Sequence, residues 1–151
     1  MTNGITEELD ECRGGELAFW EIALADDALV MRDKAPAFVY DLEERTARFG
    51  EAIIRFSRKI PWSPVNNRLI DQLVGAGTSV GANYCEADDG VSKADFKHRI
   101  GTCRKEARET KFFLRMVAVA EPDLKAEACE IWREAHSLHR IFSHIWRSTK
   151  T

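Results

Sequence analysis

The chain has 151 residues, a formal net charge of −3, and 44% hydrophobic and 31% charged residues. This length fits one domain with a sizeable core, and no apolar run approaches the ~20 residues that would span a bilayer. The N-terminus lacks the basic-then-apolar order of a signal peptide, and no Cys-x-x-Cys pair occurs among the four cysteines. We therefore expect a cytoplasmic protein with reduced thiols at Cys12, Cys85, Cys103 and Cys129.

Residues 1–36 form an acidic N-terminal extension. Nine acidic and three basic residues give residues 1–34 a net charge of −6, so the remainder carries +3. A short amphipathic helix over about 16–33, a flexible leader, a partner-docking segment and an upstream start codon are all compatible with this composition. We expect a weak helix that follows a disordered stretch of about a dozen residues.

Four segments within residues 37–149 repeat apolar or small residues with a 4-3 spacing. They cover about residues 42–60, 69–87, 96–117 and 124–145. This period is typical of helices that pack in bundles. Helix-start signals precede the segments at Asp41, Ser63-Pro64, Ser92 and Glu121-Pro122. Because the links between segments are short, the sequence predicts an all-α, antiparallel up-down four-helix bundle.

Glycines mark one face of the second segment. Gly77 and Gly81 are one helical turn apart, and the third segment has its own glycine at Gly101. Each glycine costs about 0.8–1 kcal/mol relative to alanine inside a helix. We expect close contact between the second and third helices at these positions, and a contact between subunits is the alternative.

Polar residues form a stripe beside the apolar seam on the second and third helices. A buried polar side chain without a partner is costly, so we expect these residues to form an interhelical hydrogen-bond network. Pairing about Gly90 would place Gln72 near Glu109, and Ser79 near Thr102 or Cys103. The members of the predicted network are Gln72, Ser79, Asn83, Glu86, Glu106 and Glu109.

A metal-binding carboxylate site is the functional alternative for these residues. Bundle di-iron proteins use Glu-x-x-His motifs, and this chain contains none. Phosphate-binding loops and nucleophile signatures are also missing from the sequence. We therefore expect no catalytic residues, no metal and no cofactor.

The third helix also carries a basic stripe, one position after its apolar seam. A solvated helix face is the ordinary explanation, and contact with a phosphate backbone is the functional one. Its members are Lys97, Arg104, Arg108, Lys111 and Arg115.

Apolar residues off the four seams predict a stable oligomer, because so much spare apolar surface is unusual on a monomer. These residues are Ile54, Ile70, Val74, Phe112, Phe113 and Trp132.

The order of these motifs resembles a four-helix bundle family first noticed as proteins encoded in intervening sequences of bacterial 23S rRNA genes. The resemblance covers about residues 38–146 and begins with Tyr40-Asp41-Leu42. The matching residues are Ser79, Val80, Asn83 and Glu86, then Ser92, Asp95 and Phe96, and then Glu106, Glu109 and Thr110. Tyr84-Cys85 departs from the family pattern, and residues 87–90 lack its usual basic charge.

The resemblance implies an up-down bundle that assembles as a homopentameric ring, without known enzymatic activity. A related branch serves as accessory protein to the reverse transcriptase of diversity-generating retroelements and binds nucleic acid. Our main hypothesis is therefore a non-enzymatic, ring-forming bundle that binds RNA or a ribonucleoprotein partner. The alternative is a purely structural protein–protein interaction module that binds no nucleic acid.

Overall fold

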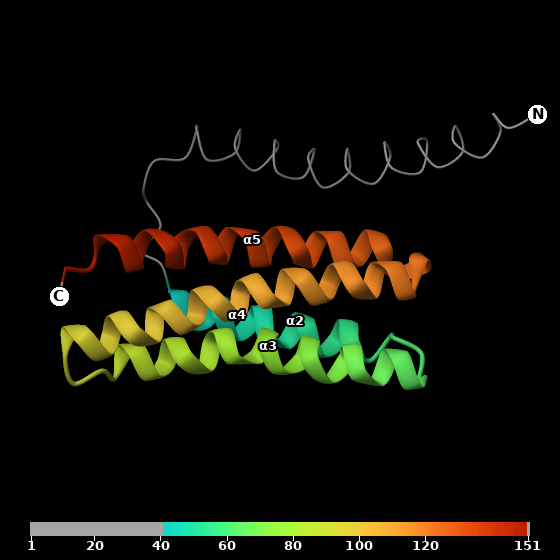
Figure 1. The fold of residues 1–151 in the computed structure, drawn as a ribbon, viewed down its shortest axis with the longest axis horizontal. Helices are drawn as coiled ribbons and strands as arrows, with labels where there is room; N and C mark the ends of the chain where they lie inside the picture. Colours follow the sequence, from blue (N-terminus) through green and yellow to red (C-terminus); the bar gives the residue numbers. More distant parts are fainter. Residues whose placement is uncertain (1–40, 151) are drawn as a thin grey trace, which may run out of the picture. The chain divides into compact units, whose positions relative to one another are not determined.

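The computed structural model describes residues 41–150, so the acidic extension predicted for residues 1–36 lies outside the described part of the chain. Four α-helices follow one another: α2 (Leu42–Ser57), α3 (Pro64–Asp88), α4 (Lys93–Ala120) and α5 (Lys125–Ser148). A short 3₁₀ turn, η1 (Pro122–Leu124), precedes α5. The helices pack side by side, each antiparallel to the next (Figure 1), and residues 41–150 contain no strand. The predicted antiparallel four-helix bundle is confirmed.

Side-chain caps begin three of the four helices where the sequence predicted them. Asp41 Oδ1 accepts a hydrogen bond from the Glu44 amide at 2.9 Å, and Ser92 Oγ accepts one from the Asp95 amide at 3.1 Å. Ser63 caps α3 in the same way. Each cap satisfies an amide that has no partner within its helix.

The fourth helix begins differently. The sequence predicted that Pro122 opens the last helix directly, but Pro122 begins η1, and α5 follows from Lys125 without a side-chain cap. A proline fits the first position of either kind of helix, so the sequence signal does not distinguish them.

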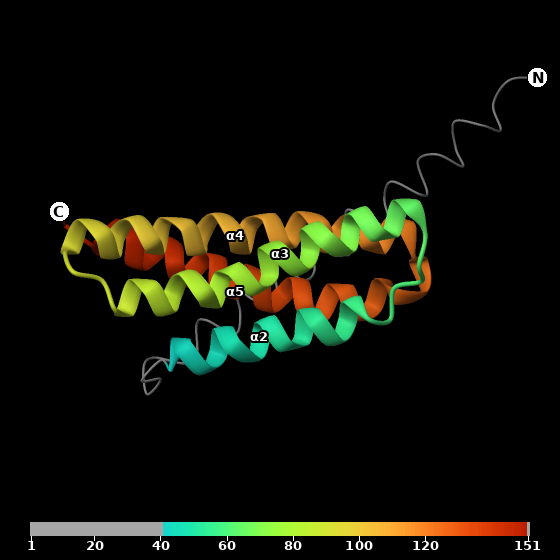
Figure 2. The same cartoon turned by 90° about the horizontal axis from the view of Figure 1, so that it is seen from below.

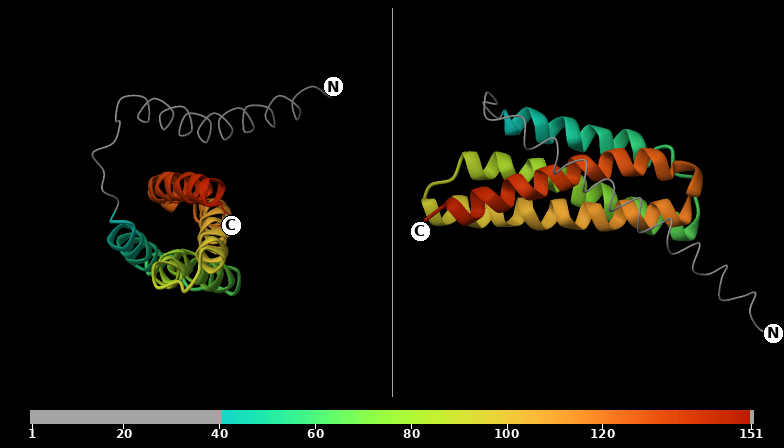
Figure 3. Two further views of the ribbon diagram at one scale, coloured as in Figure 1. Left: turned by 90° about the vertical axis from the view of Figure 1, so that its left-hand side faces the viewer. Right: turned by 90° about the horizontal axis from the view of Figure 1, so that it is seen from above.

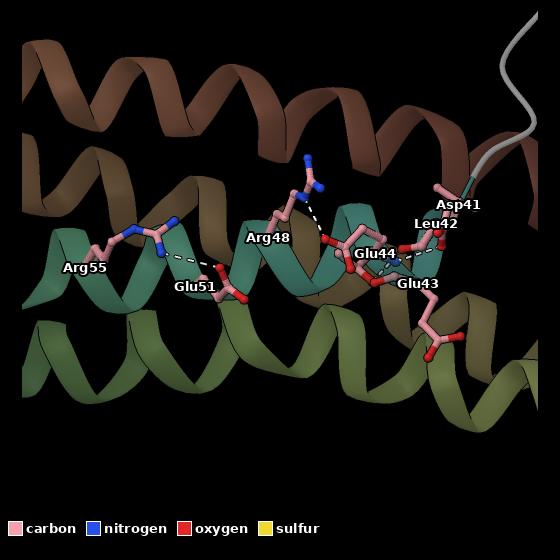
Figure 4. Close-up of polar contacts among 8 residues, drawn as sticks. Asp41, Leu42, Glu43, Glu44, Arg48, Glu51 and Arg55 are labelled. Atoms are coloured by element: carbon pink, nitrogen blue, oxygen red, sulfur yellow. Dashed lines mark hydrogen bonds and ion pairs between the residues drawn. The ribbon is translucent and has the colours of Figure 1, made fainter.

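Exposed ion pairs line the outer face of α2 (Figure 4). Arg48 pairs with Glu44 at 2.7 Å, and Arg55 pairs with Glu51 at 3.4 Å. Such i,i+4 pairs add only about 0.3–0.5 kcal/mol each. Helix α2 is therefore held mainly by its apolar face.

The helices are arranged so that α3 lies between α2 and α4 (Figure 2), and α4 lies between α3 and α5. Viewed along its length, the bundle places α2, α3, α4 and α5 in sequence around the axis (Figure 3, left). Among the described helices, the backbone of α2 does not closely approach that of α4, nor the backbone of α3 that of α5. Side chains still bridge the second pair, because the rings of Tyr84 on α3 and Phe142 on α5 lie 5.8 Å apart between centroids. Arg45 of α2 pairs with Glu134 of α5 at 2.7 Å and donates to Ser137 Oγ at 2.8 Å. Lys59, just after the end of α2, pairs with Glu127 of α5 at 2.8 Å.

The core follows the predicted 4-3 seams. Its largest fully buried apolar side chains are Phe56, Phe142, Ile53, Leu73, Ile100, Leu114, Leu138, Val80 and Val117. Every one of them occupies a seam position. The period of the sequence therefore identifies the buried face of each helix correctly.

Gly77 and Gly81 of α3 face α2 rather than α4, which corrects the prediction from the sequence. A Cβ on Gly77 would lie 2.7 Å from Cγ1 of Ile53, and one on Gly81 would lie 3.3 Å from Oγ1 of Thr46. Gly101 of α4 meets the indole of Trp146 on α5 instead. Helical spacing shows that two glycines share a face, but it does not say which neighbouring helix that face meets.

Candidate nucleic-acid interface

The basic stripe of α4 lies on the flank that faces α5. Lys97 Nζ is 5.1 Å and Arg104 Cζ is 4.4 Å from the centroid of the Trp146 ring. Lys111 Nζ is 5.1 Å from the centroid of the Trp132 ring. The stripe follows the core seam by one position, and one residue turns a helix by about 100°, which takes these side chains from the core toward the neighbouring helix.

We call this surface the α4–α5 seam. It consists of Lys97, Arg104, Arg108, Lys111 and Arg115 of α4, and of Trp132, His136, His139 and Trp146 of α5. The exposed side chains of Arg140 and Arg147 follow His136 by four and eleven residues. Helical periodicity therefore places them on the same face of α5.

The two tryptophans hold cations in place over their rings. Trp132 is only 9% exposed, so it is not the spare surface residue that the sequence suggested. The imidazole of His136 stacks on Trp132 with a centroid distance of 5.2 Å and an interplanar angle of 3°. Cation–π contacts contribute about 0.5–2 kcal/mol and fix the direction of a long side chain. The indoles thus orient Lys97, Arg104 and Lys111.

The positive charge of the stripe is not compensated by carboxylates within residues 41–150. Ion pairs there involve other cations, such as Arg99 with Glu86 and Arg45 with Glu134. Arg108 and Arg115 are exposed, while the other three stripe residues are half-buried. An uncompensated row of cations attracts polyanions.

The centre of the seam shows the electrostatic consequence of this crowding. The pKa of His139 is lowered to about 4, chiefly by burial and to a smaller extent by the nearby charges of Lys111, His136, Arg108 and Arg104. Burial also lowers the pKa of Lys111, with a smaller effect from Arg108. Lys111 Nζ lies 3.1 Å from His136 Nδ1. A bound anion would relieve this repulsion.

The residues from α5 were not part of the predicted interface, although the sequence contains a signal for them. Residues 132, 136, 139, 143 and 146 repeat with the 4-3 spacing, one position after the apolar seam of α5. The basic stripe of α4 has the same offset from its own seam. In two antiparallel neighbouring helices, the flanks with the same offset from the apolar seam face each other. The basic stripe of α4 therefore meets this stripe of α5.

The polar stripe of α3 and α4 lies on the opposite flank of α4. Gln72, Ser79, Asn83 and Glu106 are half-buried, whereas Glu86 and Glu109 are exposed. Asn83 Nδ2 donates to the Ser79 carbonyl of its own helix at 2.9 Å. Within residues 41–150 no hydrogen bond joins members of this predicted network across the two helices, and the link that does form is the ion pair of Glu86 with Arg99.

The register of α3 against α4 differs by about one turn from the predicted one. With Glu86 opposite Arg99, Ser79 is level with Glu106 rather than with Thr102 or Cys103. The pKa of the Cys103 thiol is raised to about 12, chiefly by burial and to a smaller extent by Cys85. Cys103 therefore lies within electrostatic reach of Cys85 rather than opposite Ser79.

The register correction also separates the other predicted pair. With Glu86 opposite Arg99, Gln72 is level with Phe113 rather than with Glu109.

Burial raises the pKa of Glu106, and the charge of Glu109 adds to this. Within the described part of the chain, no group of three or more His, Cys, Asp or Glu side chains could hold a metal ion.

Large apolar side chains remain exposed in several places. Ile54 and Phe112, two of the residues predicted to lie off the seams, are 45% and 54% exposed. Ile70, Val74 and Phe113 are half-buried. Trp62, Val65, Val91 and Val119 are exposed as well. None of the helices in residues 41–150 is both long and apolar enough to cross a membrane.

The fold is shared with a solved bacterial protein. That protein, of unknown function and from the S23 ribosomal protein family, comes from Bacteroides thetaiotaomicron VPI-5482. It is 24% identical to this chain, and the match covers 70% of this chain and 98% of the other with a TM-score of 0.62. At this identity the likeness establishes the helical bundle alone. No protein-family model and no curated protein matches the chain.

Proposed function

We propose that this protein is a non-enzymatic helical bundle that binds RNA through the α4–α5 seam. The observation that carries the proposal is the row of five cations on α4, none of which forms an ion pair within residues 41–150. Phosphate groups spaced along a strand are the natural partner for such a row. The S23 name of the structural neighbour fits a ribonucleoprotein setting.

The arrangement favours contact with the phosphate backbone over reading of bases. Single-strand readers stack bases on exposed aromatic rings. Here Trp146 carries Lys97 and Arg104, and Trp132 carries Lys111 and His136. Little ring surface is left for a base, so the protein should bind different RNA sequences with similar affinity.

A charge-reversal pair tests the RNA proposal. Arg104→Glu with Arg108→Glu should abolish binding to a structured RNA at low salt and leave the helical circular dichroism intact. The matched control reverses Arg48 and Arg55 of α2, a helix whose backbone does not closely approach α4. The control has the same net charge as the α4 variant but keeps the basic stripe of α4. It should therefore retain most of the affinity. Equal affinity of wild type and the α4 variant would refute the RNA proposal.

The salt dependence of binding gives an independent measure. Each phosphate contact contributes about 0.7–0.9 to the slope of log affinity against log salt, so five contacts predict a slope near 4. Lys97→Ala should lower that slope by about one contact, equally for all RNA sequences. Deleting residues 1–35 should strengthen binding, because it removes acidic residues that repel or compete with phosphates.

We also propose that the bundle forms a homo-oligomer, and a pentamer on the strength of the family resemblance. Exposed Ile54 and Phe112 support association, because burying such side chains stabilises an interface. Light scattering coupled to size exclusion tests this proposal. A monomer at tens of micromolar would overturn it.

The same exposed apolar residues favour the alternative function, a structural interaction module without nucleic acid. Under that alternative, Phe112→Ser would weaken assembly while the α4 charge reversal would change nothing. The free thiols of Cys85, Cys103 and Cys129 agree with our proposal that the protein works in the cytoplasm.

A further inference from the structure

The centre of the α4–α5 seam differs in chemistry from its ends. At the ends, the cations are arginines and lysines alone. At the centre, two imidazoles from α5 join three cations from α4. We call this group the central cluster: Arg104, Arg108, Lys111, His136 and His139.

We propose that the central cluster is a site where a phosphate and a proton bind together. The proposal rests on the proposed function, because RNA would supply the phosphate. It adds that RNA binding takes up a proton at this site and strengthens as the pH falls.

The charges around His139 support proton uptake. From α4, the groups that act on its imidazole are Arg104, Arg108 and Lys111, and from its own helix His136. No carboxylate within residues 41–150 is among them. Burial and these neighbours keep the free imidazole neutral at pH 7, because a further positive charge would be repelled. A phosphate bound among the same groups places a negative charge beside the imidazole of His139, and that charge favours the protonated form.

The contact between Lys111 and His136 supports the same conclusion. A protonated lysine can only donate, so at 3.1 Å His136 Nδ1 accepts the hydrogen bond and carries no proton. Protonating that nitrogen would set two donors against each other. A phosphate oxygen that accepts from both groups removes the conflict, so proton and phosphate stabilise each other's binding.

The size of the effect follows from linkage. The pKa of His139 is about 4 in the free protein. If a bound phosphate restores it to the ordinary value near 6.5, the affinity rises about tenfold between pH 7.5 and pH 5.5. At pH 6 the protein then takes up about 0.75 proton per chain on binding.

The probe is a ten-nucleotide oligouridylate with 5′-hydroxyl ends, which itself has no group that titrates between pH 5.5 and 7.5. Affinity is measured across this range, and proton uptake at pH 6 comes from calorimetry in two buffers of different ionisation enthalpy. The same oligonucleotide with a 5′-phosphate identifies the source of the anion. Tighter binding of the phosphorylated form indicates a terminal phosphate, and equal binding indicates internal phosphodiesters.

The test variant is His136→Gln with His139→Gln, and the matched control is His144→Gln, an exposed histidine of the same helix. We expect wild type and control to gain about tenfold in affinity and the test variant to gain less than threefold. Wild-type binding with less than 0.2 proton taken up would overturn this inference and leave the proposed function standing. Absence of wild-type binding even at pH 5.5 would instead overturn the proposed function.

Discussion

The close approach of α3 to α2 at Gly77 makes a sharp prediction about stability. We compare Gly77→Ala with Gly75→Ala, two changes of the same kind made two residues apart in one helix. A Cβ on Gly75 meets nothing within 4 Å, whereas a Cβ on Gly77 meets Cγ1 and Cγ2 of Ile53 at 2.7 Å and 2.9 Å. Ile53 is fully buried, so its branched side chain has little room to move.

The magnitudes follow from these distances. Both substitutions gain about 0.8–1 kcal/mol of helix propensity. Gly77→Ala also forces carbon atoms well inside their optimal separation of about 3.5–4.0 Å, and overpacking of this kind costs about 1–3 kcal/mol. We therefore expect Gly75→Ala to raise the free energy of unfolding by about 1 kcal/mol and Gly77→Ala to lower it by about the same amount. The two melting temperatures should differ by roughly 8 °C.

Urea denaturation followed by circular dichroism, at one protein concentration, measures both variants. A double-mutant cycle with Ile53→Ala then isolates the contact. Ile53→Ala alone should cost about 2–5 kcal/mol, and the added methyl of Gly77→Ala should recover at least 1 kcal/mol of that loss. If Gly77→Ala were as stable as Gly75→Ala, the helices would not meet at this position, and the packing argument would fail.

Three further predictions concern single side chains. Asn83→Ala should change the free energy of unfolding by less than about 1 kcal/mol, because within residues 41–150 the Asn83 amide bonds only to its own helix. A loss above 2 kcal/mol in denaturant titrations would show a partner across an interface. In a Cys12→Ser background, Ellman's reagent at pH 8 should label exposed Cys85 quickly and Cys103 only on unfolding, since burial raises the pKa of Cys103 to about 12; rapid labelling of Cys103 would contradict its burial. The pKa of His139 is depressed to about 4 in the folded protein, so between pH 6.5 and 4 the unfolded chain binds a proton that the folded protein does not. The free energy of unfolding is therefore unaffected by His139 above pH 6.5 and declines as the pH falls toward 4, by at most about 1.4 kcal/mol per pH unit. His139→Gln should flatten the stability curve in that window, and an unchanged curve would contradict the assignment.

Much of the fold could be predicted from the sequence because it depends on local chemistry. Asp41, Ser63 and Ser92 begin helices because their side chains satisfy amides three residues later. The 4-3 spacing identified the buried face of each helix, as the burial of Phe56 and Phe142 shows. These features need no knowledge of which helices are neighbours.

Only the α4 half of the candidate site could be predicted from the sequence. The sequence showed the cations of α4 as a stripe, because a helix brings residues at 4-3 spacing onto one face. It did not show that Trp132 and Trp146 orient those cations, since each ring lies on another helix, far from its cation along the chain. Nor did it show that Asn83 bonds within α3, because an amide can satisfy itself locally as well as across helices.

The sequence by itself determined which residues share a face, and the tertiary structure alone decided what each face meets. The 3.6-residue period fixes the first, because it is a property of one helix. The second depends on the order of helices around the axis and on their relative heights, which the connections and the packing of whole faces set together. For that reason Gly77 meets α2 rather than α4, Ser79 is level with Glu106, and the cations of α4 lie over the aromatic rings of α5.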